Sequence, residues 1–126
     1  MRLALLKLTT AALATTFALI GASISKPDPG QGRVLFERRC TGCHALDRVK
    51  AGPPLGGIFG KAAGRNSQYP YSDALKNAHV LWDEGTLDRW LADPEAIVPG
   101  NDMSFRLESA DERADIVAYL RQLGGK

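Results

Sequence analysis

A chain of 126 residues with a formal net charge of +2 is long enough for one domain and too short for two. Arg2 and Lys7, near the N-terminus, account for that charge, because residues 26–126 carry equal numbers of basic and acidic side chains. The charge therefore gives no indication of a nucleic-acid partner or of binding to a membrane surface.

The first 25 residues have the pattern of a secretory signal peptide. A basic start at residues 1–7 is followed by an apolar run over residues 8–20 and by small residues at 21–23. An uncleaved anchor is the alternative, because the apolar stretch 8–24 is at the short limit of what spans a bilayer. We expect a periplasmic protein whose single domain is 26–126, bound to the membrane only if the N-terminal segment is retained.

The first helix of the domain is predicted to begin at Asp28, which can cap free amides, with Pro29 at the first helical position. This helix runs into Cys40. Residues 49–71, which follow, are rich in Gly and Pro and predict a long loop. A loop of that length in a compact domain is usually functional, and here it can coat a ligand.

Both cysteines of the chain lie in the pentapeptide Cys40-Thr41-Gly42-Cys43-His44. C-x-x-C-H is typical of covalent haem attachment, in which two thiols add across the two vinyl groups of haem. On a helix, positions i, i+3 and i+4 share a face, so His44 can reach the iron from beside Cys40 and Cys43. We therefore expect one haem c, attached through Cys40 and Cys43.

The two cysteines could also form a redox dithiol, a zinc site or a structural disulfide. A redox dithiol would need a βαβ pattern nearby, which this sequence lacks. A zinc site would need further ligands, and His79 is the one spare histidine. A structural disulfide in an exported chain would leave His44 unexplained.

Four further elements are predicted after the loop. A short helix is expected over residues 72–78, and another over 84–92 with Asp83 as its cap. Pro94 starts one more turn. The last helix has the clearest pattern, with a capping box at 109–112, a stop at Gly124 and apolar residues at helical spacing, namely Ile116, Leu120 and Leu123. The fold class is all-α, with four to five short helices and long loops.

Met103 is the only methionine besides Met1, and it lies in the segment Pro99–Phe105. A methionine in a loop is more often a core residue. The Pro-Gly turn before it, and the need of an electron-transfer iron for a sixth ligand, favour Met103 as an axial ligand. His44 and Met103 are therefore the predicted metal ligands.

From Asp28 to Leu123 the chain resembles the mitochondrial-type class I cytochromes c and their bacterial relatives. The segments that carry the resemblance, besides C-x-x-C-H, are Gly32–Phe36, Gly52-Pro53, Met103–Phe105 and Asp111–Leu120. The resemblance implies the class I cytochrome c fold, in which loops wrap one covalent haem. It also implies that the first and last helices cross closely at Gly32.

The resemblance further implies roles for four residues around the haem. The carbonyl of Pro53 would accept the ring N–H of His44, which would fix the histidine tautomer. Three side chains would donate to a haem propionate, namely Lys61, Tyr71 and Trp82. The alternatives are that the two aromatic residues are ordinary core residues and that the lysine is solvated.

Four residues depart from the mitochondrial pattern and leave the potential and the partner open. Leu75 replaces an asparagine, Trp90 replaces a tyrosine, and Asn101-Asp102 replaces a threonine-lysine pair. None of them lies in the attachment motif.

The function that the resemblance implies is single-electron transfer in a respiratory chain by a His/Met-ligated haem, without enzyme activity. Expected partners are a dehydrogenase, a cytochrome complex or a terminal oxidase, and the protein is expected to be a monomer. One alternative is a haem peroxidase-like enzyme, which would need an open iron position and an acid-base group above it. Another is a dedicated electron-accepting subunit of a dehydrogenase.

Overall fold

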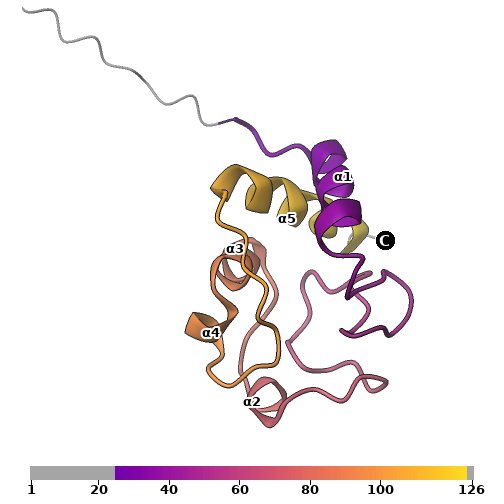
Figure 1. Cartoon of the computed structure of the whole chain (residues 1–126), viewed down its shortest axis with the longest axis vertical. Helices are drawn as coiled ribbons and strands as arrows, with labels where there is room; N and C mark the ends of the chain where they lie inside the picture. Colours follow the sequence, from indigo (N-terminus) through magenta and orange to yellow (C-terminus); the bar gives the residue numbers. More distant parts are fainter. Residues whose placement is uncertain (1–24, 125–126) are drawn as a thin grey trace, which may run out of the picture.

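The computed structural model describes residues 25–124 and contains five helices in that range, as the sequence predicts (Figure 1). The only strand-like feature among these residues is an isolated antiparallel bridge between Ala62 and Leu81. Apart from Ser25, the predicted signal segment lies outside the described residues. Within the described range, no helix combines the length and hydropathy that a membrane crossing needs.

Helix α1 (Pro29–Arg39) crosses helix α5 (Ala110–Gly124) at one end of the molecule (Figure 1). As predicted, α1 begins at Asp28, whose side chain accepts hydrogen bonds from two of the free amides of the first turn. At the crossing, a Cβ added to Gly32 would lie 1.9 Å from the backbone oxygen of Asp115. The close approach of the two helices therefore requires glycine at position 32.

Helices α2 (Asp73–Lys76) and α3 (Glu84–Ala92) both begin at side-chain caps, and the cap of α3 is the predicted one. Ser72 caps α2, which is shorter than expected. Asp83 caps α3 and accepts a hydrogen bond from the amide of Thr86 at 2.8 Å, while the Thr86 hydroxyl accepts one from the amide of Asp83 at 2.9 Å. This reciprocal pair is a capping box that fixes the start of α3.

Helix α4 (Pro94–Ile97) follows α3 directly, and α5 begins after Ser109. The Ser109 hydroxyl accepts from the amide of Glu112 at 3.2 Å, which is the first half of the predicted capping box. Gly124, predicted to stop α5, lies within the helix. A Cβ at this glycine would lie 3.0 Å from the Cβ of Phe59, so close packing against the long loop is a physical reason for glycine there.

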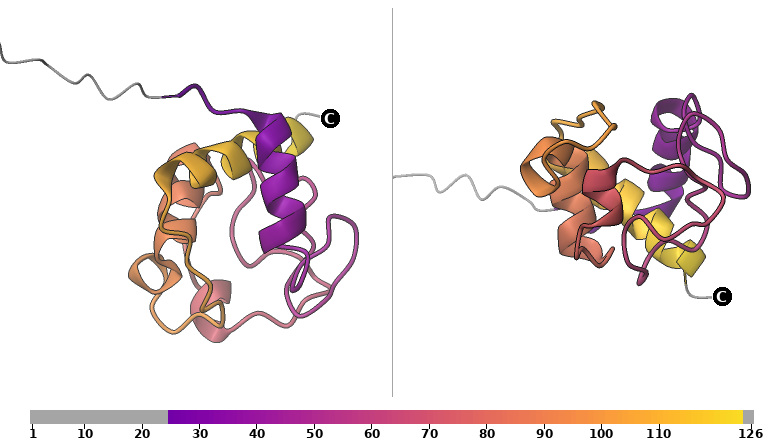
Figure 2. Two further views of the ribbon diagram at one scale, coloured as in Figure 1. Left: turned by 45° about the horizontal axis from the view of Figure 1, so that its top comes forward. Right: turned by 90° about the horizontal axis from the view of Figure 1, so that it is seen from below.

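The helices and the long loop enclose the centre of the molecule from different sides. In Figure 2 the segment 40–72, which contains no helix, lies on one side, and α3, α4 and the segment after α4 lie on the other. Helix α5 joins the two sides at one end, where it packs against both α1 and α3.

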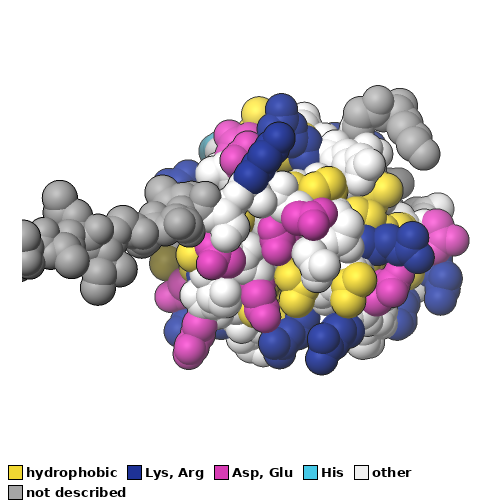
Figure 3. Space-filling view, turned by 90° about the horizontal axis from the view of Figure 1, so that it is seen from above, with side chains coloured by type: hydrophobic (Ala, Val, Ile, Leu, Met, Phe, Trp, Pro, Cys, Tyr) yellow, Lys and Arg dark blue, Asp and Glu magenta, His cyan; other side chains and the backbone are white. Residues whose placement is uncertain are grey.

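The surface over α1 and α5 carries basic and acidic side chains intermixed, without a large patch of one sign (Figure 3). Arg33 pairs with Glu37 at 3.0 Å, and Arg39 pairs with Glu112 at 3.6 Å. Because these ion pairs are largely exposed to solvent, each contributes little to stability.

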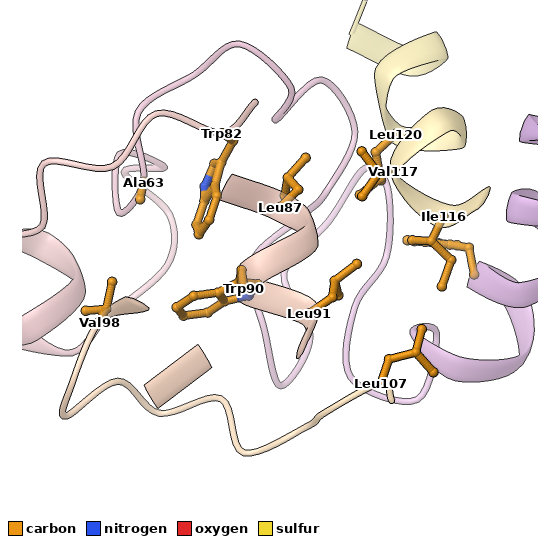
Figure 4. Close-up of a cluster of buried hydrophobic side chains, with 11 residues drawn as sticks. Ala63, Trp82, Leu87, Trp90, Leu91, Val98, Leu107, Ile116, Val117 and Leu120 are labelled. Atoms are coloured by element: carbon orange, nitrogen blue, oxygen red, sulfur yellow. The ribbon is translucent and has the colours of Figure 1, made fainter. Parts of the chain in front are cut away.

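The core lies between α3, α5 and the loops that face them (Figure 4). Trp82 and Trp90 meet nearly edge to face, with ring centroids 5.2 Å apart, and Phe36 of α1 lies against Tyr119 of α5 at 5.6 Å. The other core residues are aliphatic: Ala63, Leu87, Leu91, Val98, Leu107, Ile116, Val117 and Leu120.

Candidate functional site

A cavity of about 310 Å³ lies at the centre of the molecule, between the segment 40–72 and the helices opposite. Seven core side chains also form its wall: Phe36, Trp82, Leu87, Trp90, Leu91, Ile116 and Leu120. The wall is therefore mainly apolar, and the hydrophobic core is built around the cavity instead of filling it.

The attachment motif reaches this cavity directly from the end of α1. The amides of Cys43 and His44 both donate to the carbonyl of Cys40, at 3.1 and 2.8 Å, so the chain turns once more after the helix. This turn places Cys40, Cys43 and His44 together on the cavity wall. Both cysteines are free thiols, with Cys40 half-buried and Cys43 exposed.

Burial is the main cause that raises the pKa of the Cys40 thiol, to about 11, and the neighbouring Cys43 adds to it. The Cys40 thiol is therefore protonated at neutral pH in the chain without a cofactor.

The ring of His44 is held by Gly52 and Pro53 of the long loop. Its Nδ1 lies 2.8 Å from the carbonyl oxygen of Pro53, the contact that the family resemblance implies. A Cβ on Gly52 would lie 2.2 Å from Cε1 of the ring, so only glycine allows this approach. When Nδ1 carries the proton and donates it to Pro53, Nε2 keeps a free lone pair that can bind a metal.

Met103 reaches the same cavity from the segment between α4 and α5. Its side chain is half-buried, and its amide donates to the side-chain oxygen of Asn101 at 2.8 Å. The fold thus brings an imidazole and a thioether, far apart in sequence, to one apolar cavity.

The predicted propionate donors differ in their positions. Tyr71 and Trp82 line the cavity, and burial raises the pKa of the Tyr71 hydroxyl, which keeps it protonated and able to donate. Lys61 is exposed and is not part of the wall. The propionate contacts of all three stay predictions.

Sequence reasoning missed Tyr69, which also lines the cavity. Its hydroxyl donates to the carbonyl of Ala51 at 2.9 Å, and its ring meets that of Tyr71 edge to face at 4.8 Å. Tyr69 therefore ties the end of the long loop to its beginning. The sequence does offer one indication of this role, because Tyr69 lies in the Gly- and Pro-rich loop only two residues before Tyr71.

The residues at the cavity fit a covalently attached haem. The cavity of about 310 Å³ has a mainly apolar wall, which is unfavourable in contact with water, so an apolar group bound in the cavity would stabilise the fold. Two free thiols, an imidazole with a free Nε2 and a thioether match the attachment points and axial ligands of haem c.

Comparisons with known proteins agree with this donor set. The family described as Cytochrome c matches residues 30–124. A cytochrome c of Chlamydomonas reinhardtii is 41% identical over 99 residues, which cover 75% of this chain and 88% of that protein. One from Sesamum indicum is 40% identical over 108 residues, covering 80% and 97%. Among solved structures, cytochrome cH from Methylobacterium extorquens is similar, with a TM-score of 0.71 and 38% identity, covering 75% of this chain and 98% of the other.

Proposed function

This chain belongs to the cytochrome c family of electron carriers, which hold one covalent haem c, and we propose that it transfers single electrons through a His/Met-ligated iron. In this proposal Cys40 and Cys43 form the two thioether links. His44 supplies one axial ligand through Nε2, and Met103 supplies the other through its sulfur.

The observation that supports the proposal is the convergence of His44 and Met103 on the wall of one apolar cavity. The bound haem would supply the redox chemistry. Pro53 orients the imidazole and raises its basicity through the Nδ1 hydrogen bond. The apolar wall keeps water from the centre of the cavity, and a thioether ligand favours the reduced iron and so raises the potential.

An electron carrier is favoured over a peroxidase-like enzyme because Met103 would fill the iron position that a substrate needs. His44 is the only histidine at the cavity wall in the described part of the chain. The family consists of electron carriers that are in general not enzymes.

We place the mature protein in the periplasm, beginning near Lys26, because of the signal-like pattern of the first 25 residues. Its partners would be other redox proteins: a dehydrogenase, a cytochrome complex or a terminal oxidase. If the segment is retained, the domain acts as a tethered carrier at the membrane.

The test is an intact-mass measurement and a visible spectrum of protein purified from an exporting host. We expect the mass of one haem on a chain that starts near Lys26. We also expect a low-spin ferric spectrum with the weak band near the red end that reports sulfur–iron ligation. A high-spin spectrum without that band would contradict His/Met ligation, and a full-length mass would contradict cleavage.

A further inference from the structure

The segment that carries Met103 is attached to the rest of the molecule by few hydrogen bonds. Within residues 25–124, the amides of Ser104, Phe105 and Arg106 make none. The next backbone bond after Met103 is from the amide of Leu107 to the carbonyl of Leu91, at 2.8 Å. Met103 and Phe105 pack against the core, and the hydrogen bonds that position Met103 precede it in the chain.

Those hydrogen bonds are made by two side chains, of Asn101 and Glu95. Asn101 accepts from the amide of Met103 at 2.8 Å and donates through Nδ2 to the carbonyl of Val98 at 2.9 Å. Val98 is buried in the core, 5% exposed. The backbone amide of Asn101 also donates to the carbonyl of Val98, at 3.2 Å, so Asn101 links the predicted ligand to the core through its side chain and its backbone.

Glu95, in α4, holds the turn before Asn101. Its two carboxylate oxygens lie 3.0 and 3.1 Å from the amide of Gly100, which donates to them, and one of them also lies 3.4 Å from Nδ2 of Asn101. Gly100 has a φ of +82°, a conformation that glycine adopts without strain. The amide of Gly100 has no other acceptor among the described residues. Glu95 therefore satisfies the one free amide of the turn and fixes its orientation.

A hollow of about 240 Å³ lies between α4 and the Met103 segment, lined by Glu95, Asn101, Met103 and Arg106, among others. Close packing does not hold the segment on this side. Arg106 reaches across to Asp93 at 2.7 Å, but Arg106 is 57% exposed, so that ion pair contributes little. The hydrogen bonds of Glu95 and Asn101 therefore act together with the packing of Met103 and Phe105 against the core.

We infer that Glu95 and Asn101 are positioning residues that hold the methionine segment closed and so set how readily Met103 leaves the iron. The inference rests on the proposed ligation by Met103. In this inference, opening of the segment breaks two links: the hydrogen bond from the Gly100 amide to Glu95 and the one from the Met103 amide to Asn101. Removing the Glu95 acceptor takes the net contribution of its hydrogen bonds away from the closed form, because water then pairs with the exposed Gly100 amide in both forms, and opening becomes easier.

The test uses the ferric holoprotein and imidazole as an external ligand that replaces Met103. At saturating imidazole, the rate at which the red-end band disappears reports the opening of the segment. We expect Glu95→Ala to raise this limiting rate about three- to tenfold, the effect of losing one or two net hydrogen bonds. Glu95→Gln keeps an oxygen acceptor for Gly100 and should restore a rate close to that of the unmutated protein.

Glu84→Ala is the matched control, because Glu84 is also an exposed glutamate in the first turn of a helix, and within residues 25–124 its carboxylate pairs with Arg121 alone. Its rate should not change. An unchanged rate in Glu95→Ala, or equal acceleration by Glu95→Gln, would overturn the inference. If the unmutated protein lacks the red-end band, the proposed ligation fails instead.

A measurement without mutation gives an independent check. In the unmutated holoprotein, the Gly100 amide should exchange with deuterium more slowly than the Ser104 amide, because only Gly100 has an acceptor. Equal exchange at the two positions would also overturn the inference.

Discussion

His44 and Met103 differ in how firmly the protein holds them. His44 lies in the turn that follows α1, its Nδ1 lies 2.8 Å from the carbonyl oxygen of Pro53, and Gly52 lies against its ring. Met103 lies on a segment whose amides from Ser104 to Arg106 make no hydrogen bond within residues 25–124 and which packs against the core through Met103 and Phe105. In addition, Cys40 and Cys43, which both precede His44 in the motif, would hold it beside an attached haem. We therefore expect Met103 to be the ligand that leaves first.

Met103→Ala should keep the covalent haem, because both cysteines remain, and should open the sixth iron position. The potential should fall, since the thioether that favours reduced iron is lost. Carbon monoxide binding and peroxidase side activity should increase, because small molecules can then reach the iron. Visible spectroscopy and a potentiometric titration provide the measurement. A variant that keeps its low-spin spectrum and potential would show that Met103 is only a core residue.

At the scale of elements, the crossing of α1 and α5 depends on Gly32. Gly32→Ala should lower the free energy of unfolding by about 1–3 kcal/mol, because the new methyl group meets the backbone of Asp115, which cannot move independently. Urea unfolding of the holoprotein measures the change. Gly85→Ala in α3 is the matched control: its methyl group would meet only the Asp83 carboxylate at 3.6 Å, and the substitution should stabilise slightly. Equal changes in the free energy of unfolding for Gly32→Ala and Gly85→Ala would contradict the requirement for glycine where α1 crosses α5.

The Asp83 cap at the start of α3 should make the stability of the fold depend on pH. Hydrogen bonds from the backbone and side chain of Thr86 lower the pKa of the Asp83 carboxylate from 3.8. A lowered pKa means that the cap contributes stability above about pH 3.8 and loses it as the pH falls through the folded value. Thermal unfolding of Asp83→Asn should therefore differ most from the unmutated protein at neutral pH, and the difference should shrink at pH 3. If the difference in melting temperature between Asp83→Asn and the unmutated protein were the same at pH 7 and pH 3, a role for ionisation of Asp83 would be excluded.

Elements with local signals were predicted well from the sequence, and contacts between distant loops were not. Asp28 and Asp83 cap the helices they were expected to cap, because an N-cap depends only on the next three residues. The attachment motif is contiguous and therefore recognisable. In contrast, the hydrogen bond from the Gly100 amide to Glu95 of α4 and the one from the Tyr69 hydroxyl to Ala51 involve loop residues without any periodic pattern. Neither contact leaves a sequence pattern that would predict it.

At the scale of the whole molecule, the fold should depend on haem, because most of the core also forms the cavity wall. The double variant Cys40→Ala, Cys43→Ala should lack both thioether links and yield a largely unfolded chain without haem. Far-UV circular dichroism measures its helix content, and Met103→Ala, which keeps both links, is the folded control. A helical double variant that melts cooperatively without haem would show that the chain folds without the cofactor.

The charge distribution of the whole molecule also bears on how it meets a redox partner. Residues 26–126 have no formal net charge, and Arg39, the basic residue at the cavity wall, pairs with Glu112 at 3.6 Å. Asp102, exposed beside Met103, is acidic where the mitochondrial-type relatives carry lysine. Long-range attraction should therefore be weak, and contact should depend more on a small apolar rim, for which Phe105 and the loop 56–58 are candidates.

Electron transfer to the natural partner should consequently change only slightly with ionic strength, since few exposed charge pairs are available to be screened. Stopped-flow oxidation from low to high salt measures this dependence. The protein should react poorly with a mitochondrial oxidase, and Asp102→Lys should improve that reaction. Glu95→Lys would add a second positive charge but would also break the bond to Gly100, so Asp102→Lys alone isolates the effect of charge. A steep fall in rate with salt for the unmutated protein would mean that its charges are concentrated on the docking face.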